Sequence, residues 1–184
     1  MHEHRLIERM VDVLKAEIDL IKLGQGPDID LLRRTVDFFR MYADRCHHGK
    51  EEDILFRELK KKDLSPELRA RMDELIQDHK DARQMVSSLE EATTSFSQGN
   101  DDAREQIRTL LARLVAFYPH HIKMEDNHFF HPCMEYFTKE EQKAMLDEYW
   151  EFDKNLIHEK YGTIVDRFET MTPQVERKVG EQVE

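Results

Sequence analysis

Two histidine–glutamate pairs with the same spacing have side chains that can bind a metal ion. His47 precedes Glu51 by four residues, and His121 precedes Glu125 by four. Each pair lies in a segment that we expect to be helical, so its two side chains share one helix face. Because isolated buried charges are costly, a bound cation is the simplest explanation for such pairs in a core.

Two further histidines extend this set. His4 continues the apolar stripe of the first expected helix, and His79 lies within the apolar stripe of the third. Taken singly, each histidine is better explained as a hydrogen-bonded core residue. Together, four imidazoles and two carboxylates without a metal would need a closed hydrogen-bond network. A structural zinc site closes at four ligands, so six inward ligands indicate two metal ions. The excess of nitrogen ligands favours iron or zinc.

The elements that must position these residues follow from the apolar periodicity. It predicts five helices, at about residues 3–23, 28–61, 65 to the polar run at 93–102, 101–130, and 139–169. The breaker stretch from Gly24 to Pro27 ends the first helix. Ser65 caps the third, and a capping box from Thr138 to Glu141 begins the fifth. We expect an all-α fold, an antiparallel up-down four-helix bundle with an additional C-terminal helix.

Helical geometry distinguishes the two adjacent histidines of the second helix. In an α-helix His47 and His48 differ by about 100° around the axis. A step of four back from His47 reaches Ala43, whereas the same step from His48 reaches Asp44. We therefore expect His47 to face the core. Solvent exposure, with hydrogen bonding to the ligands as the alternative, is expected for His48, Glu52 and His120.

Composition and charge set the broad class. The chain has 184 residues, of which 36% are charged and 39% hydrophobic, with 6 Gly and 5 Pro, which favours one helical domain at residues 1–170 and a polar tail at 171–184. The net charge of −11 argues against nucleic-acid and anionic-membrane partners. No apolar run approaches the roughly 20 residues of a membrane span. Without a signal peptide, and with only two cysteines, a cytoplasmic protein is expected.

Four short segments carry a family pattern in their order and spacing: Glu3-His4-Arg5, His47-His48-Gly49-Lys50-Glu51-Glu52-Asp53-Ile54-Leu55-Phe56, Asp78-His79, and His121-Ile122-Lys123-Met124-Glu125-Asp126-Asn127-His128-Phe129-Phe130. Over about residues 3–132 they resemble the hemerythrin/HHE cation-binding domain. The resemblance implies a four-helix bundle with an oxo- or hydroxo-bridged non-heme di-iron centre, in which zinc can replace iron in recombinant material. It implies bridging by Glu51 and Glu125 and terminal ligation by His4, His47, His79 and His121.

The chain departs from the oxygen-carrying hemerythrins at three places. Arg83 occupies the position of their second third-helix histidine, Glu125 follows His121 by four residues rather than five, and His131 precedes the displaced Pro132. With four histidines, two octahedral irons joined by two carboxylates and a single-atom bridge keep two open positions. A fifth histidine would leave one. His158, on the fifth helix, is a candidate for an additional ligand.

These observations favour a protein that binds a diatomic ligand, oxygen or nitric oxide, for sensing, storage or detoxification. One alternative is a di-iron redox enzyme, or an iron donor for the repair of damaged iron centres. Another is a metal-stabilised interaction module whose acidic surface or fifth helix engages a protein partner. Near the expected centre, Tyr118 is either a gate to the pocket or, by default, a core residue.

Overall fold

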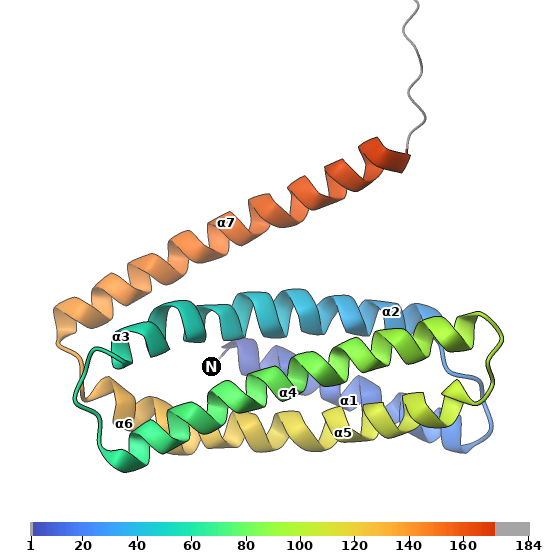
Figure 1. The fold of residues 1–184 in the computed structure, drawn as a ribbon, viewed down its shortest axis with the longest axis horizontal. Coiled ribbons are helices and arrows are strands. Elements are labelled where there is room, and N and C mark those ends of the chain that lie inside the picture. Colours follow the sequence, from blue (N-terminus) through green and yellow to red (C-terminus); the bar gives the residue numbers. More distant parts are fainter. Residues whose placement is uncertain (1, 172–184) are drawn as a thin grey trace, which may run out of the picture.

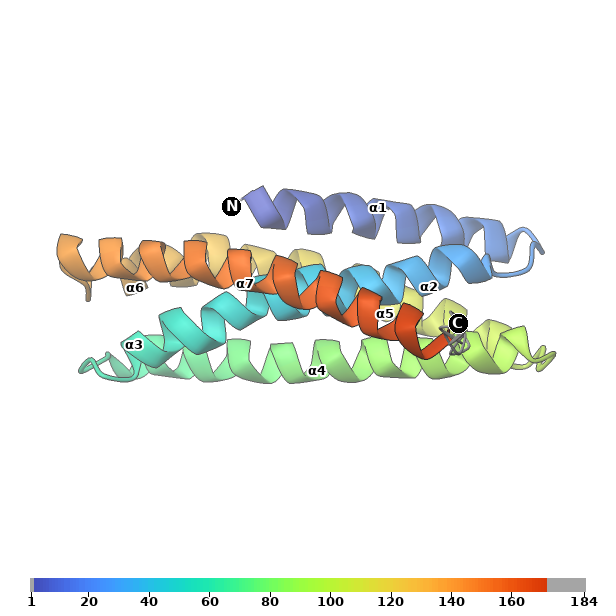
Figure 2. The ribbon, with the colours of Figure 1, turned by 90° about the horizontal axis from the view of Figure 1, so that it is seen from above.

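The computed structural model describes the backbone of residues 2–171 and the side chains of residues 3–156. Within that part of the chain all regular structure is helical, so the predicted all-α class is confirmed. Figure 1 shows four long helical segments lying side by side, with the chain turning back at each connecting loop, and a last helix crossing one face of this group. Figure 2 shows the same last helix passing over the second segment.

The first helix, α1 (His2–Lys22), carries the predicted apolar stripe on its buried face. Ile7, Val11, Leu14, Ile18 and Ile21 are all buried. The helix ends where Gly24 adopts a φ of +90°, a conformation that side chains with a Cβ rarely adopt. The second segment then begins at Asp28, whose carboxylate accepts a hydrogen bond from the Leu31 backbone at 3.0 Å, as an N-cap does.

The second segment contains long π-helical stretches. It comprises α2 (Ile29–Phe38), the π-helices η1 (Phe39–His48) and η2 (Glu51–Phe56), and the short α3 (Arg57–Leu59). The expectation of a regular α-helix was wrong here. In a π-helix each hydrogen bond spans five residues instead of four, so successive side chains differ by only about 80° around the axis. Neighbouring residues therefore share a buried face more readily than they do at the 100° spacing of an α-helix.

The third and fourth segments are longer than predicted. Helix α4 (Pro66–Ser97) begins with the expected Ser65 cap, which accepts a hydrogen bond from the Leu68 backbone at 3.2 Å, but it continues through half of the polar run predicted as a loop. Ala92 and Thr93 are buried where this extension begins. Their burial explains why the segment stays helical. The fourth segment comprises α5 (Ala103–Met124), η3 (Glu125–Phe129) and α6 (Phe130–Met134).

The final helix, α7 (Lys139–Met171), begins at the predicted capping box. Thr138 and Glu141 exchange side-chain-to-backbone hydrogen bonds of 2.9 and 3.2 Å. Its N-terminal half packs on η1 and η2, and Glu148 accepts two hydrogen bonds from Arg57 of α3. Apart from Met171, the predicted polar tail lies outside the described residues.

Two apolar clusters form the core, one on each side of a buried polar layer. The larger cluster joins α1, α2, α4 and α5 around Leu14, Leu89 and Leu114. The smaller one joins η2, α4, η3 and α7 around Phe56 and Phe129. The layer between them contains histidine and glutamate side chains that are almost completely buried. Such a layer interrupts an otherwise apolar interior and requires a chemical explanation.

No helix among the described residues combines the length and the low polarity that crossing a bilayer demands.

Candidate metal centre

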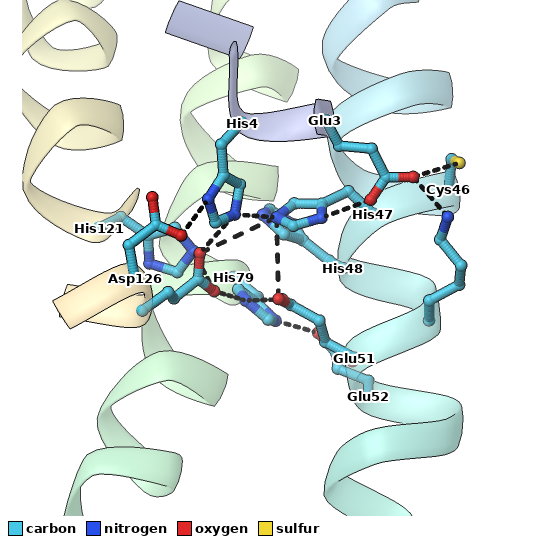
Figure 3. A network of polar contacts seen from close by, with 12 residues as sticks. Glu3, His4, Cys46, His47, His48, Glu51, Glu52, His79, His121 and Asp126 are labelled. Atoms are coloured by element: carbon cyan, nitrogen blue, oxygen red, sulfur yellow. Dashed lines mark hydrogen bonds and ion pairs between the residues drawn. The ribbon is translucent and has the colours of Figure 1, made fainter. Parts of the chain in front are cut away.

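The six residues predicted as ligands converge in the buried polar layer. Figure 3 labels five of them, His4, His47, Glu51, His79 and His121, whose side chains are gathered between the helices. None of the six is more than 2% exposed. They come from every one of the four long segments: His4 from α1, His47 and Glu51 from the second segment, His79 from α4, and His121 and Glu125 from the fourth segment. Their role as ligands remains a prediction, but their proximity is a property of the structure.

A seventh residue, His48, belongs to the same layer. The expectation that His48 faces solvent was wrong: it is 0% exposed, and its ring stacks on that of His79 with 3.9 Å between centroids. Both adjacent histidines of the π-helical η1 face inward, and the smaller angle between successive side chains in a π-helix favours this. By contrast, His120 on the α-helical α5 is exposed as expected.

The donor atoms fall into two groups. One group contains the ring nitrogens of His48, His79 and His121, and the other contains His4, His47, Glu51 and Glu125. Within each group the donor atoms all lie within 4.8 Å of one another. Both groups therefore have the composition and the spacing that a transition-metal ion requires.

Each of the two glutamates faces both groups. One oxygen of Glu125 lies 3.1 Å from Nε2 of His4, and its other oxygen lies 3.1 Å from Nε2 of His121. The oxygens of Glu51 lie 3.8 Å from Nε2 of His47 and 3.3 Å from Nε2 of His79. A carboxylate that presents one oxygen to each side has the orientation of a bridge between two cations.

The outward nitrogen of each predicted histidine ligand is hydrogen-bonded to a carboxylate. Nδ1 of each ring donates to an acid at 2.7 to 3.1 Å, in the pairs His4–Asp126, His47–Glu3, His79–Glu52 and His121–Asp78. This bond fixes the tautomer and leaves the Nε2 lone pair directed into the centre. Histidines that bind metals in proteins almost always have such a partner.

These acids occupy equivalent positions in two halves of the chain. An acid immediately precedes His4 and His79, as Glu3 and Asp78, and an acid immediately follows Glu51 and Glu125. In each half the preceding acid binds the histidine of the following segment. The acid after each glutamate binds the histidine of the other half. The polar layer therefore has an approximate internal two-fold repeat.

The buried carboxylate oxygens and Nε2 atoms of the layer are arranged as the ligand atoms of a cation are. All four carboxylate oxygens of Glu51 and Glu125 are buried without a hydrogen bond. Nε2 of His4 lies 3.0 Å from Nε2 of His47. With metal–nitrogen bonds of about 2.1 Å, two ligands at a right angle on one ion lie about 3.0 Å apart. Without a metal these atoms need shared protons.

In the metal-free protein we expect the side chains of His47, His79 and His121 to be protonated. Although burial opposes a charged imidazole, Glu51, Glu125 and Glu3 raise the pKa of His47 to about 10. Burial also opposes the charged form of His79, but the nearby carboxylates of Glu125, Glu51 and Glu52 raise its pKa to about 11. Against the same effect of burial, Asp78 and Glu125 raise the pKa of His121 to about 9.

His48 behaves differently from the other inner histidines. Burial, together with the charges of the neighbouring imidazoles, holds its pKa well below the usual range. Asp44 approaches its Nδ1 at 3.4 Å without forming a hydrogen bond. His48 is therefore a neutral imidazole with an available lone pair.

Several residues around the centre have structural roles. Glu52 takes the predicted alternative, a hydrogen bond to His79. Arg83, which replaces the second third-helix histidine, supports this arrangement by donating to Glu52 at 2.8 Å and to Asp44 at 2.7 Å. Tyr118 is 1% exposed and stacks on Phe39, as a core residue does. The His158 side chain lies outside the described residues.

A second network connects α7 to the centre through Glu3. Lys50 binds Glu3 and lies 3.0 Å from Asp153 of α7. Although burial disfavours the charged carboxylate, hydrogen bonds from His47 and Lys50 lower the pKa of Glu3 to about 2. The Cys46 thiol donates weakly to the same two acids, at 3.7 and 3.5 Å. Glu3 is thus shared between a predicted ligand and the final helix.

Two pockets reach the centre from different sides. A pocket of about 430 Å³ between η2, α6 and α7 has His47 and Glu51 among its lining residues and apolar walls, made by Leu55, Phe130, Met134, Met145, Leu146 and Tyr149. A smaller one of about 230 Å³ reaches His48 past Arg40, Asp44 and Arg83. The larger pocket is the apolar one.

Sequence reasoning missed His48 and the acids Glu3, Asp78 and Asp126 as members of the site. The acids could have been found, because each adjoins a predicted ligand at the same offset in both halves of the chain. For His48 no comparable signal exists, since the residues four positions before and after it, Asp44 and Glu52, are polar.

Comparison with known proteins agrees with this geometry. The family model described as the hemerythrin HHE cation-binding domain matches residues 1–133 and, in a second overlapping match, residues 71–176. The second match begins in α4, just before His79, as the internal repeat of the polar layer would place it. No curated protein and no solved structure matches the chain. The chain belongs to the hemerythrin HHE cation-binding domain family, and its buried histidine and glutamate groups indicate a metal-binding protein of that family.

Proposed function

We propose that this chain is a hemerythrin-like non-heme di-iron protein that binds a diatomic ligand, oxygen or nitric oxide, for sensing, storage or detoxification. Its helices would form an antiparallel up-down four-helix bundle with an additional C-terminal helix. In the proposed centre Glu51 and Glu125 bridge two irons, which an oxo or hydroxo group also joins. The terminal ligands are His4, His47, His79 and His121.

The main support for this proposal is the orientation of the two buried glutamates, Glu51 and Glu125. Each directs one oxygen toward the His4–His47 side and the other toward the His79–His121 side. A single cation would use the oxygens of one side only and leave the others buried without a partner, which is costly. Two cations use all four oxygens and all four Nε2 atoms.

Two iron ions held in this way supply redox equivalents and an open coordination position for a small molecule. The protein contributes the rigid donor set, because each predicted histidine ligand is fixed by its own carboxylate partner. The surrounding apolar clusters exclude bulk water from the layer. Low polarity around the centre strengthens the interaction of the carboxylates with the cations.

The lining of the larger pocket, between η2, α6 and α7, favours a small, uncharged ligand. The acidic groups at the pocket, Glu3, Glu51 and Asp126, repel anions, and the ammonium group of Lys50 is already paired with Glu3 and Asp153. Apart from His47, His131 and Gln142, the other lining residues are aliphatic or aromatic. Oxygen and nitric oxide, which are neutral and weakly polar, match this lining better than charged or hydrogen-bonding substrates do.

Anaerobic titration of the metal-free protein with ferrous iron, followed by exposure to oxygen or nitric oxide, tests the proposal. We expect two irons per chain and, on oxidation, the charge-transfer absorption of a bridged di-iron centre. A stable adduct supports ligand binding, whereas continuous ligand consumption supports the redox-enzyme alternative. Saturation at one iron or fewer, with no charge-transfer band, would refute the proposal.

A metal-responsive interaction module is a second candidate, and the Glu3 network favours it. Lys50 connects Asp153 of α7 to Glu3, which in turn holds the Nδ1 atom of His47. A change in charge at His47 on metal binding therefore alters the electrostatic environment of Lys50 and of α7. Hydrogen exchange on α7 with and without iron tests this candidate, and equal protection in both states counts against it.

A further inference from the structure

We propose that the pocket between η2, α6 and α7 binds a small neutral organic molecule with an apolar body and one hydrogen-bond acceptor, as in an aromatic ketone. Figure 1 shows α6 and the start of α7 at the same end of the molecule. This inference rests on the proposed function and deepens it, because it names the class of organic molecule that is held beside the di-iron centre. The binding itself can be tested without iron.

The pocket is much larger than a diatomic ligand needs. Its volume is about 430 Å³, whereas a water molecule, which is similar in size to oxygen, takes up about 30 Å³ in the liquid. Pockets of about 300–1,000 Å³ are typical of sites for organic ligands. Leu146 is 58% exposed and marks the mouth, whereas His47 and Glu51 are buried and mark the inner end. A diatomic ligand would occupy only that inner end and leave the outer part for a second molecule.

The charged groups at the pocket already have partners. Lys50 pairs with Glu3, and Asp126 pairs with Arg5 at 3.1 Å. The carboxylate of Glu51 is assigned to the proposed metal ions. A charged ligand would therefore lose its hydration without gaining a counter-ion, which is costly. The ligand that fits these surroundings is neutral.

Tyr149 of α7 gives the pocket a hydrogen-bond donor. Among the residues that the structure describes, none forms a hydrogen bond with its hydroxyl group. Burial, followed by the charge of Glu51, raises the pKa of Tyr149 above its usual range, so the hydroxyl keeps its proton at neutral pH. The side-chain amide of Gln142, which also lines the pocket, instead donates to the backbone carbonyls of Met134 and Phe137. A ligand with one acceptor would satisfy the Tyr149 hydroxyl.

The walls around this donor suit an aromatic or aliphatic body. Apolar side chains from η2, α6 and α7 line the pocket: Leu55, Phe130, Met134, Met145 and Leu146. Two of them are methionines, whose flexible thioethers adapt to the shape of a bound molecule. Ligand pockets commonly combine such walls with a small number of polar groups that fix orientation. Acetophenone, a phenyl ring with one carbonyl group, has both features and is the probe we choose.

Titration of the zinc-loaded protein with acetophenone, followed by NMR of ¹³C-labelled methionine methyl groups, tests the inference. We expect saturable shifts of the Met134 and Met145 signals, because both side chains line the pocket. The signal of Met85, which lies in the larger core cluster, should not change. Met145→Trp should fill the pocket and abolish the shift of the Met134 signal.

The substitution Tyr149→Phe isolates the contribution of the hydroxyl group. It should weaken acetophenone binding by about 3–10-fold, as the loss of one hydrogen bond does. The binding of ethylbenzene, which has a similar body without the carbonyl group, should be unchanged in the same variant. Tyr136→Phe is the matched control, because the Tyr136 hydroxyl accepts a hydrogen bond from the Ser65 backbone instead. This control should bind both probes like the wild type.

The outcomes separate the pocket from the metal centre. If the wild-type protein holds two Zn²⁺ ions and acetophenone shifts neither methionine signal, the inference is overturned and the di-metal centre stands. Equal acetophenone affinities of Tyr149→Phe and the wild type would overturn the assignment of a ligand with an acceptor. Saturable methionine shifts in a protein that takes up fewer than two Zn²⁺ ions would support the pocket and overturn the proposed centre.

Discussion

Binding of zinc to the metal-free protein should release about three protons per chain at pH 8. The pKa values of His47, His79 and His121 are raised to about 10, 11 and 9. All three are therefore mostly protonated at pH 8 when no metal is present. Because a metal binds only the neutral imidazole, each of them must lose its proton during loading.

The magnitude follows from these pKa values. At pH 8, one pH unit below the lowest of them, the three rings together carry nearly three protons. The apparent overall constant for binding both zinc ions should then rise about 1000-fold per pH unit near pH 8. A hydroxide bridge formed from water would add one proton to the count. His48 adds none, because its pKa is well below the usual range.

Calorimetric titrations in buffers with different ionisation enthalpies give the proton count directly. His120→Ala is the control, since it removes an exposed imidazole next to His121 and should not alter the count. Release of three to four protons agrees with the charge balance described above. Release of fewer than two would show that the inner histidines are already neutral in the metal-free protein and would refute this reasoning.

Further perturbations have defined outcomes. The raised pKa values of His47, His79 and His121 stabilise the metal-free protein, and this contribution is complete below about pH 6.5 and is lost as pH rises from about 9 to 11. The urea midpoint of the metal-free protein should therefore fall between about pH 9 and 11. The urea midpoint of the zinc-loaded protein should fall less over the same range. Glu3→Gln and Asp78→Asn, which affect equivalent positions in the two halves, should each weaken zinc binding by about 10–100-fold in chelator competition, whereas Asp12→Asn on the surface should not. Met145→Trp should fill the apolar pocket and slow nitric oxide binding several-fold in stopped-flow experiments at unchanged iron content, and an unchanged rate would exclude this access route. Leu114→Ala, at a 0% exposed position away from the centre, should lower the free energy of unfolding by about 2–5 kcal/mol in urea with and without metal.

Most of the fold follows from local sequence signals. Apolar residues at helical spacing define the buried faces of α1 and α4, and the predicted caps at Ser65 and Thr138 mark helix starts that the structure contains. The polar run after Thr93 was misjudged, because its buried residues favour continuation of α4 more than its polar residues favour a loop. Burial by tertiary packing determined the helix end there, and composition did not.

Part of the candidate centre could also be predicted from the apolar periodicity of the helices. An imidazole or carboxylate in an apolar stripe is anomalous in any α-helix, which is how His79 and Glu125 could be singled out. His48 could not be singled out, because the residues one helical turn before and after it, Asp44 and Glu52, are polar, and the π-helical turn of η1 that favours its inward position was not predicted. Hydrogen bonds that span five residues rather than four are not signalled by apolar periodicity. The outer acids depend on contacts between helices far apart in sequence, such as His4 with Asp126.

Anomalous diffraction from crystals of iron-loaded protein, recorded on both sides of the iron absorption edge, tests the di-iron centre most directly. We expect two iron peaks in the polar layer, one beside His4 and His47 and the other beside His79 and His121. Glu51 and Glu125 should each contact both peaks. A single peak, or peaks only at surface carboxylates with the inner histidines bonded to one another, would contradict the existence of a two-metal centre.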